Sequence, residues 1–103
     1  MTIDPFLHTP ARLSVMSLLA PAEWVRFSFL RESIGTSDSA LSKQLSSLED
    51  VGYLEVRKER GAGRGTSVRL TQVGRAAFED YLGRLEQLVA RSRGTVPAPA
   101  KKG

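Results

Sequence analysis

The sequence predicts a mainly α-helical α+β domain, and three observations support this prediction. The 103 residues are 41% hydrophobic and 25% charged, a balance typical of a folded globular domain. Apolar residues recur every three to four positions in several stretches, which is the spacing of helices that bury one face. Two shorter stretches alternate apolar and polar residues on either side of a glycine-rich loop, which indicates a β-hairpin.

The composition excludes several classes of function. The chain has no cysteine, which excludes disulfides, thiolate metal sites and cysteine nucleophiles. No apolar run approaches the roughly 20 residues that span a bilayer, and the first residues lack the features of a signal peptide. We therefore expect a cytoplasmic protein that does not bind membranes. His8 is the one histidine, and a lone histidine is more typical of packing or capping than of metal ligation. The sequence has no recognisable nucleophile–base pair, paired carboxylates or phosphate loop. We therefore expect neither an enzyme nor a cofactor.

The first third of the chain predicts a helix and a short strand. Thr9 is a suitable N-cap, and Pro10 suits the first helical position. Pro21 then ends a helix of about residues 10–20. The aromatic and β-branched segment 24–27 favours a brief strand.

A second short helix is expected after this strand. Ser28 can cap its start, and Gly35 suits the left-handed position that follows its end. Leu30 and Ile34 would then point inward. Trp24 is expected in the core, and the alternative places it beside a small-molecule cleft.

The most informative helix is predicted at about residues 38–51. Ser37 and Asp38 give a strong start signal, and Gly52 supplies the stop. The apolar stripe of this helix consists of Leu41, Leu45, Leu48 and Val51. The opposite face carries Ser39, Ser42, Lys43, Ser46 and Ser47, with Gln44 at its flank. Solvated helix faces usually hold more Glu and Lys, because serine is a poorer helix former. This face therefore suits close approach to a partner rich in hydrogen-bonding groups.

A hairpin and a long helix complete the prediction. Residues 53–59 and 67–70 form the two strands, and Thr71 caps a helix of about residues 71–92. The apolar stripe of this last helix is wider than the core of one small domain requires. We therefore expect a homodimer whose interface includes Leu13, Tyr81, Leu82, Leu85, Leu88 and Val89. The domain is expected to cover residues 1–93, followed by a disordered tail over 94–103.

The net charge of +4 is concentrated in one segment. Residues 57–75 hold six basic side chains and one acidic side chain, whereas the rest of the chain holds nine basic and ten acidic ones. A positive field of this kind favours docking of a polyanion. The alternative is a solvated basic hairpin without a partner.

Helix, short strand, helix, glycine turn, helix, basic hairpin and long helix form the order of a winged helix-turn-helix domain. The run SDSALSKQLSSLE from Ser37 to Glu49, followed by Gly52-Tyr53, resembles the recognition helix of compact MarR-like bacterial transcriptional regulators. The run Leu70-Thr71-x-x-Gly74-Arg75 resembles their junction between wing and last helix. The resemblance covers residues 8–90. The chain differs from larger MarR proteins because it lacks their added helices. It resembles ArsR-type repressors in size but lacks their cysteine metal ligands.

The resemblance implies a homodimeric regulator, expected to be a repressor, that binds a palindromic site in double-stranded DNA. Its third helix would enter the major groove. Gln44 would pair with adenine, and Lys43 would reach guanine or phosphate. Arg64 is the best candidate for the minor groove. In full, the expected DNA-binding residues are Ser37, Ser39, Ser42, Lys43, Gln44, Ser47, Arg57, Lys58, Arg60 and Arg64. The sequence leaves open whether a small molecule acts as an effector. The alternative function is a module that uses the same surface to bind a protein.

Overall fold

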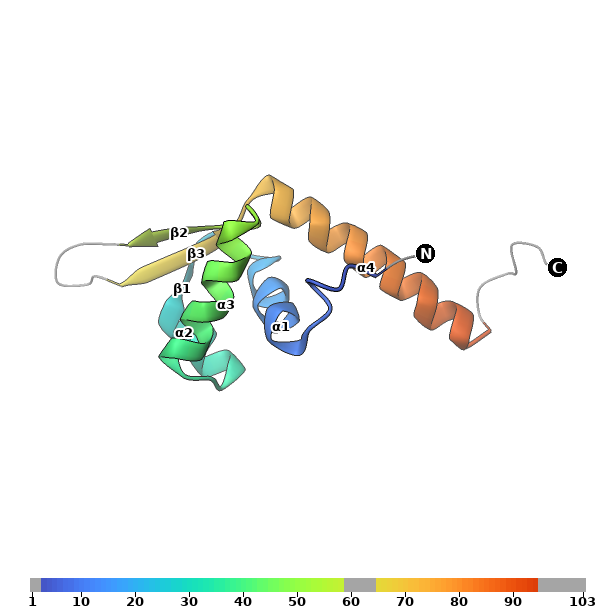
Figure 1. Cartoon of the computed structure of the whole chain (residues 1–103), viewed down its shortest axis with the longest axis horizontal. Coiled ribbons are helices and arrows are strands. Elements are labelled where there is room, and N and C mark those ends of the chain that lie inside the picture. Colours follow the sequence, from blue (N-terminus) through green and yellow to red (C-terminus); the bar gives the residue numbers. More distant parts are fainter. Residues whose placement is uncertain (1–2, 59–64, 95–103) are drawn as a thin grey trace.

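Three helices and a three-stranded antiparallel sheet enclose the core, and a long fourth helix projects from it (Figure 1). The structure, a computed structural model, describes residues 3–58 and 65–94. In chain order, the elements in these ranges are α1 (Pro10–Leu19), β1 (Val25–Arg26), α2 (Phe27–Ile34), α3 (Asp38–Asp50), β2 (Leu54–Lys58), β3 (Thr66–Leu70) and α4 (Gln72–Ser92). This is the winged helix-turn-helix architecture that the sequence predicts.

The first two helices lie where the sequence predicts them, but their caps differ. Thr9 stands at the N-cap of α1, yet its hydroxyl caps no backbone N–H and is buried without a hydrogen-bond partner. Helix α2 begins at Phe27 with Arg26 at the N-cap, so the prediction that Ser28 caps it is wrong. The reason is that β1 runs directly into α2 and leaves no linker for a capping serine. Gly35 ends α2 with a left-handed φ of 76°, as predicted.

Helix α3 is capped and packed as its sequence indicates. The hydroxyl of Ser37 accepts a hydrogen bond from the N–H of Ala40 at 3.2 Å. The buried stripe consists of Leu41, Leu45 and Leu48. Val51 does not continue this stripe, because the helix ends at Asp50 and the Val51 side chain is 46% exposed.

The sheet, in the strand order β1-β3-β2, buries one face against the helices. Leu54 pairs with Leu70 and Val56 with Val68 across the hairpin, while Val25 of β1 pairs with Val68 from the other side. Side chains alternate between the two faces of a strand. These five residues therefore face the core, and the polar residues between them lie on the opposite, outer face of the sheet.

The fully buried residues of helix α4 all lie in its first half. Phe78 and Tyr81 are buried, with their rings stacked at a centroid distance of 6.4 Å. The Tyr81 hydroxyl lies 2.6 Å from Nδ1 of His8, so this histidine holds the N-terminal segment against α4. Because Tyr81 is 1% exposed in the single chain, it has no surface to offer to the expected dimer interface. Beyond this point α4 extends away from the body of the protein (Figure 1).

The junction between β3 and α4 is packed closely against the turn that follows α3. The Thr71 hydroxyl accepts from the N–H of Gly74 at 2.9 Å and donates to the carbonyl of Gly52 at 2.6 Å. The Thr71 N–H donates to the carbonyl of Tyr53 at 3.0 Å. A Cβ on Gly74 would overlap this same carbonyl group. Glycine is therefore required at position 74, because no side chain fits between α4 and the backbone of the turn.

Gly74→Ala is expected to destabilise the protein by about 2–4 kcal/mol, because a backbone carbonyl cannot rotate away from the added methyl group. For a domain of this size, each kcal/mol corresponds to a fall in Tm of about 4–8 °C. Thermal unfolding followed by circular dichroism measures the change.

Gly83→Ala is the matched control on the same helix. A Cβ on Gly83 meets no atom within 4 Å, and alanine is the better helix former by about 1 kcal/mol. The Tm of this variant should therefore hold or rise. Equal Tm values for the two variants would contradict the close contact at Gly74.

Candidate nucleic-acid interface

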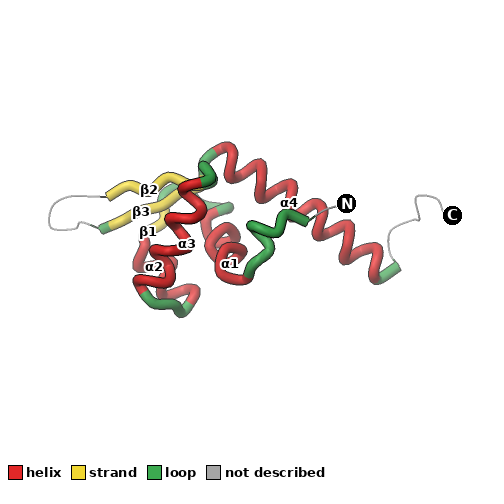
Figure 2. Tube along the Cα trace, in the orientation of Figure 1, coloured by secondary structure: helices red, strands yellow, loops and turns green. Residues whose placement is uncertain are grey.

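Helix α3 lies beside the β2–β3 hairpin, which we call the wing (Figure 2). Most side chains on its solvent-exposed face are small and polar. The exposed residues of this face are Ser37, Ser39, Ser42, Lys43 and Ser46, while Gln44 and Ser47 are half-buried. Lys43 is the one long charged side chain among them. The backbone of α3 can therefore approach a partner more closely than the backbone of a helix covered with Glu and Lys.

The start of α3 is tied to the preceding helix by an ion pair. Arg31 of α2 donates to the Asp38 carboxylate at 2.8 Å, and it lies 3.6 Å from the carboxylate of Glu32. The hydrogen bond to Asp38 and its negative charge raise the pKa of Arg31 above its usual value. The pair spans the turn between α2 and α3, so it helps to fix the angle at which α3 is presented. It also offsets the one negative charge at the exposed start of α3.

Lys58 of the wing lies on the same side of the molecule as the polar face of α3. A groove of about 400 Å³ runs between α3 and the wing. Its residues are Phe27, Asp38, Ser42, Leu45, Ser46, Glu49, Val56, Lys58 and Thr66. The geometry therefore brings together Ser42 and Lys58, two of the residues that the sequence predicts to bind DNA.

Arg57 lies on the other face of the sheet. Its guanidinium carbon is 4.1 Å from the centre of the Trp24 ring, and that of Arg69 is 4.6 Å from the same centre. The prediction that Trp24 lies in the core is therefore wrong, because the indole is half-buried beneath two arginines on the outer face. Guanidinium groups over an indole are a favourable cation–π arrangement.

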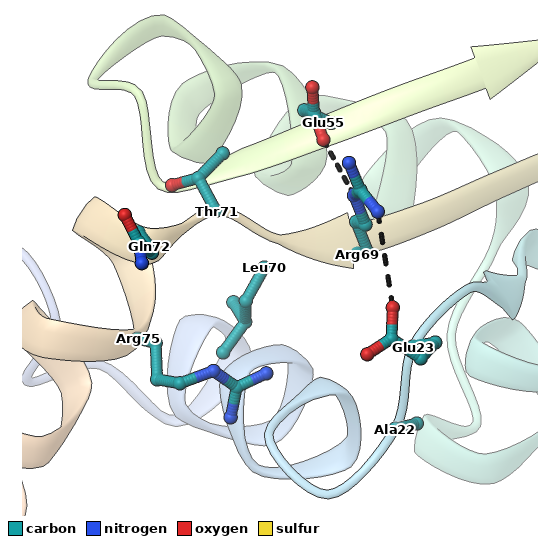
Figure 3. Close-up of a pocket in the computed structure, with 8 residues that line it drawn as sticks. All are labelled: Ala22, Glu23, Glu55, Arg69, Leu70, Thr71, Gln72 and Arg75. Carbon is teal, nitrogen blue, oxygen red and sulfur yellow. Dashed lines mark hydrogen bonds and ion pairs between the residues drawn. The ribbon is translucent and has the colours of Figure 1, made fainter.

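A polar pocket of about 430 Å³ adjoins this stack at the start of α4 (Figure 3). Arg69 donates to Glu55 at 2.6 Å and lies 3.9 Å from Glu23. Across the pocket, Arg75 donates to the carbonyl of Ala20 at 2.7 Å. Both arginines are therefore engaged by the protein itself. Arg75 fastens the end of α1 to α4, which gives the Leu70–Arg75 motif a structural role.

Gln44 is held by a residue that the sequence analysis missed. The Nε of Arg12, on α1, donates to the side-chain oxygen of Gln44 at 3.1 Å. Periodicity and motif spacing do not reveal this contact, because it joins residues 32 positions apart. Two other predicted DNA-binding residues, Arg60 and Arg64, fall outside the described residues.

The predicted dimer residues divide into exposed and half-buried groups. Leu82, Leu88 and Val89 of α4 are 37%, 43% and 38% exposed, respectively. Leu13 and Leu85 are half-buried, and both line a shallow groove between α1 and α4. These five side chains form the apolar strip, a name we keep below.

Within residues 3–58 and 65–94, no group of three or more His, Cys, Asp or Glu side chains could hold a metal ion. Of the helices in the same ranges, none combines the length and the apolar character needed to cross a membrane.

The fold, the capped and open face of α3, and the adjacent wing define the class of winged-helix DNA-binding proteins. Residues 11–89 match the family model of the winged helix DNA-binding domain, so the chain belongs to this family. An uncharacterized protein of Methanocaldococcus jannaschii is 33% identical over 82 residues, which cover 79% of this chain and 89% of the relative.

Solved structures agree with this assignment. A transcriptional regulator homologue from Pyrococcus horikoshii has a TM-score of 0.78 at 24% identity, over 82% of this chain and 84% of that one. A MarR-family regulator from Silicibacter pomeroyi has a TM-score of 0.65 at 22% identity, over 89% and 62% of the respective chains. The Mycobacterium tuberculosis regulator MosR, solved in complex with DNA, has a TM-score of 0.68 at 22% identity, over 89% and 66%. The chain thus has the winged-helix fold that these regulators share.

Arg69→Met should lower the free energy of unfolding by about 1 kcal/mol, because the variant loses the ion pairs with Glu55 and Glu23 and one cation–π contact. Trp24 is the single tryptophan, so its emission reports on this site directly. With one guanidinium removed, the indole becomes more exposed to water, and its emission maximum should move to longer wavelength.

Arg84→Met is the matched control for this prediction. Arg84 forms an exposed ion pair with Asp80 within α4, so its removal should leave the tryptophan emission unchanged. Identical spectra for both variants would contradict the stacked arrangement around Trp24.

Proposed function

We propose that this protein is a homodimeric transcriptional repressor that binds a palindromic DNA site with α3 in the major groove. The observation that carries the proposal is the exposed face of α3, which is open, polar and nearly free of bulky side chains. A major groove about 12 Å wide admits a helix, and small side chains let that helix enter deeply. A surface that binds protein would more often present aromatic anchors.

The N-terminal end of α3 suits contact with the phosphate backbone. Helix N-termini carry partial positive charge and unsatisfied N–H groups, which favour anions. Ser37 and Ser39 place hydroxyl groups at this end, and Lys43 adds a full positive charge one turn further on. We assign phosphate contacts to the two serines and a base or phosphate contact to Lys43, with Ser42 and Ser47 on either side of it.

The wing extends this positive surface. Lys58 lies across the groove from Ser42 and can reach the backbone that flanks the major groove. Arg57 lies over Trp24 on the outer face of the sheet. We assign it a contact with a DNA phosphate on that face of the wing. We retain Arg60 and Arg64 as wing contacts on the strength of the sequence, with Arg64 directed at the minor groove.

The apolar strip supports a two-fold dimer. Leu82, Leu88 and Val89 leave more than a third of their surface in water on a helix that projects beyond the core. A partner's α4, laid across the groove between α1 and α4, would cover them. Two-fold pairing would set two recognition helices about one DNA turn apart, roughly 34–36 Å, which requires a palindromic site. A dimer seated on such a site would exclude other proteins from that DNA, and this is why we infer repression.

Selection from a pool of random duplexes at two salt concentrations tests the DNA-binding proposal. A palindromic motif that survives the higher salt would support it. Recovery of random fragments at low salt alone, or of none, would contradict a sequence-specific regulator.

Lys43→Ala should weaken binding to the selected site about tenfold. If Lys43 contacts phosphate, the slope of log affinity against log salt should also become shallower by about one for each subunit. Fluorescence anisotropy with a labelled duplex at several salt concentrations measures both quantities. Arg84→Ala removes the same charge on α4 and should change neither, whereas equal effects of the two substitutions would argue against α3 as the contact surface.

Leu88→Glu should convert the dimer to a monomer, because it places a charge within the apolar strip. Sedimentation velocity gives the oligomeric state. The control is Val73→Glu at the opposite end of α4, where the side chain is 60% exposed and outside the strip. If Leu88→Glu stays dimeric, the interface lies elsewhere.

A further inference from the structure

Arg12 connects three parts of the protein beside the proposed recognition helix. Its Nε donates to the side-chain oxygen of Gln44 at 3.1 Å, and its Nη1 donates to the carbonyl of Phe6 at 2.9 Å. Its guanidinium carbon lies 4.2 Å from the centre of the Phe6 ring. The Phe6 ring in turn meets the Tyr53 ring edge to face, with centroids 6.0 Å apart. Arg12 is therefore oriented by contacts of its own before it engages Gln44.

The chemistry of arginine fixes which end of the Gln44 amide faces it. A guanidinium group has hydrogen-bond donors and no acceptor, so only the amide oxygen can point toward Arg12. The amide nitrogen then points the other way. This nitrogen has no hydrogen-bond partner among the described residues. In the same residues the Thr9 hydroxyl is the one buried side-chain polar atom without a partner, so the Gln44 nitrogen must contact solvent.

We propose that Arg12 is a specificity-determining positioning residue, which holds Gln44 so that its side chain acts toward DNA as a donor only. This inference rests on the proposed binding of α3 in the major groove. An amide paired with adenine must donate to N7 and accept from the N6 amino group at the same time. Arg12 takes one of the two lone pairs of the Gln44 oxygen and keeps this oxygen directed at α1. In this orientation the NH₂ group rather than the oxygen is presented to a base, so the expectation of an adenine pair is replaced by a different preference.

A donor-only Gln44 favours bases that present acceptors in the major groove. Guanine presents two acceptors, N7 and O6, whereas adenine presents one acceptor next to a donor. The amide NH₂ group of Gln44 therefore suits guanine and meets an unfavourable neighbour in the adenine amino group. Arg12 itself need not touch a base, because it acts through the orientation of the Gln44 side chain.

The test compares base preferences of the wild-type protein and its variants by selection from randomised duplexes and sequencing. Gln44→Ala identifies the base position that Gln44 reads, because the preference there should become flat. Arg12→Met keeps a long apolar stem beside Phe6 but cannot donate to Gln44. At that one position it should shift the preference from guanine toward adenine by about tenfold, since the freed amide can form the two-bond pair.

Two further variants show whether the effect passes through Gln44. The double variant Arg12→Met with Gln44→Ala should have the same flat preference as Gln44→Ala alone. Arg84→Met, an arginine-to-methionine change on α4, should leave the preference at guanine. A merely structural role of Arg12 would weaken binding to all sequences equally and would not move the preference at one position.

The outcomes separate the inference from the proposed function. Failure of the wild-type protein to select any motif would overturn both. A wild-type motif that Arg12→Met leaves unchanged, or weakens uniformly, would overturn the role of Arg12 alone. If Arg12→Met does not fold, nuclear magnetic resonance of the wild type decides instead. The Arg12 Nε–H signal should be protected from exchange and should lose that protection in Gln44→Ala, and an unprotected wild-type signal would overturn the inference.

Discussion

The close contact between Gly74 and the Tyr53 carbonyl determines how α4 is attached to the rest of the domain. It allows α4 to begin directly against the turn between α3 and β2, where Thr71 is bonded to Gly52, Tyr53 and Gly74. Helix α3, the wing and α4 therefore leave one small junction in fixed directions. The geometry of the candidate DNA-binding surface therefore depends on this junction.

The sequence was sufficient to predict most of the fold, because local signals and packing agree. Ser37 and Thr71 cap their helices, and Gly35 takes the left-handed φ. The three leucines of the α3 stripe are buried as their spacing predicts, although Val51 is not. The wrong predictions arose where the signal was ambiguous. Ser28 is a good cap by type, but β1 continues into α2 without a break.

The environments of individual side chains were harder to predict, because they depend on pairing between distant segments. An indole is usually assigned to the core, yet β-register places Trp24 with Arg57 and Arg69 on the outer face of the sheet. The contact of Arg12 with Gln44 likewise depends on how α1 crosses α3, which periodicity does not specify. The polar face of α3 was predictable, whereas the orientation of one amide on its flank required the three-dimensional structure.

The length of α4 has a mechanical consequence. The helix has 21 residues, so it is about 30 Å long at ~1.5 Å per residue, and one of its ends is set rigidly into the junction with the wing. In a dimer joined through the apolar strip, each α4 is a lever whose pivot lies near Leu85, about 20 Å from the junction at ~1.5 Å per residue. A change of ten degrees at the pivot would displace the junction, and α3 with it, by about 3–4 Å. The fit to a palindrome with fixed spacing would then depend on the angle at which two chains cross.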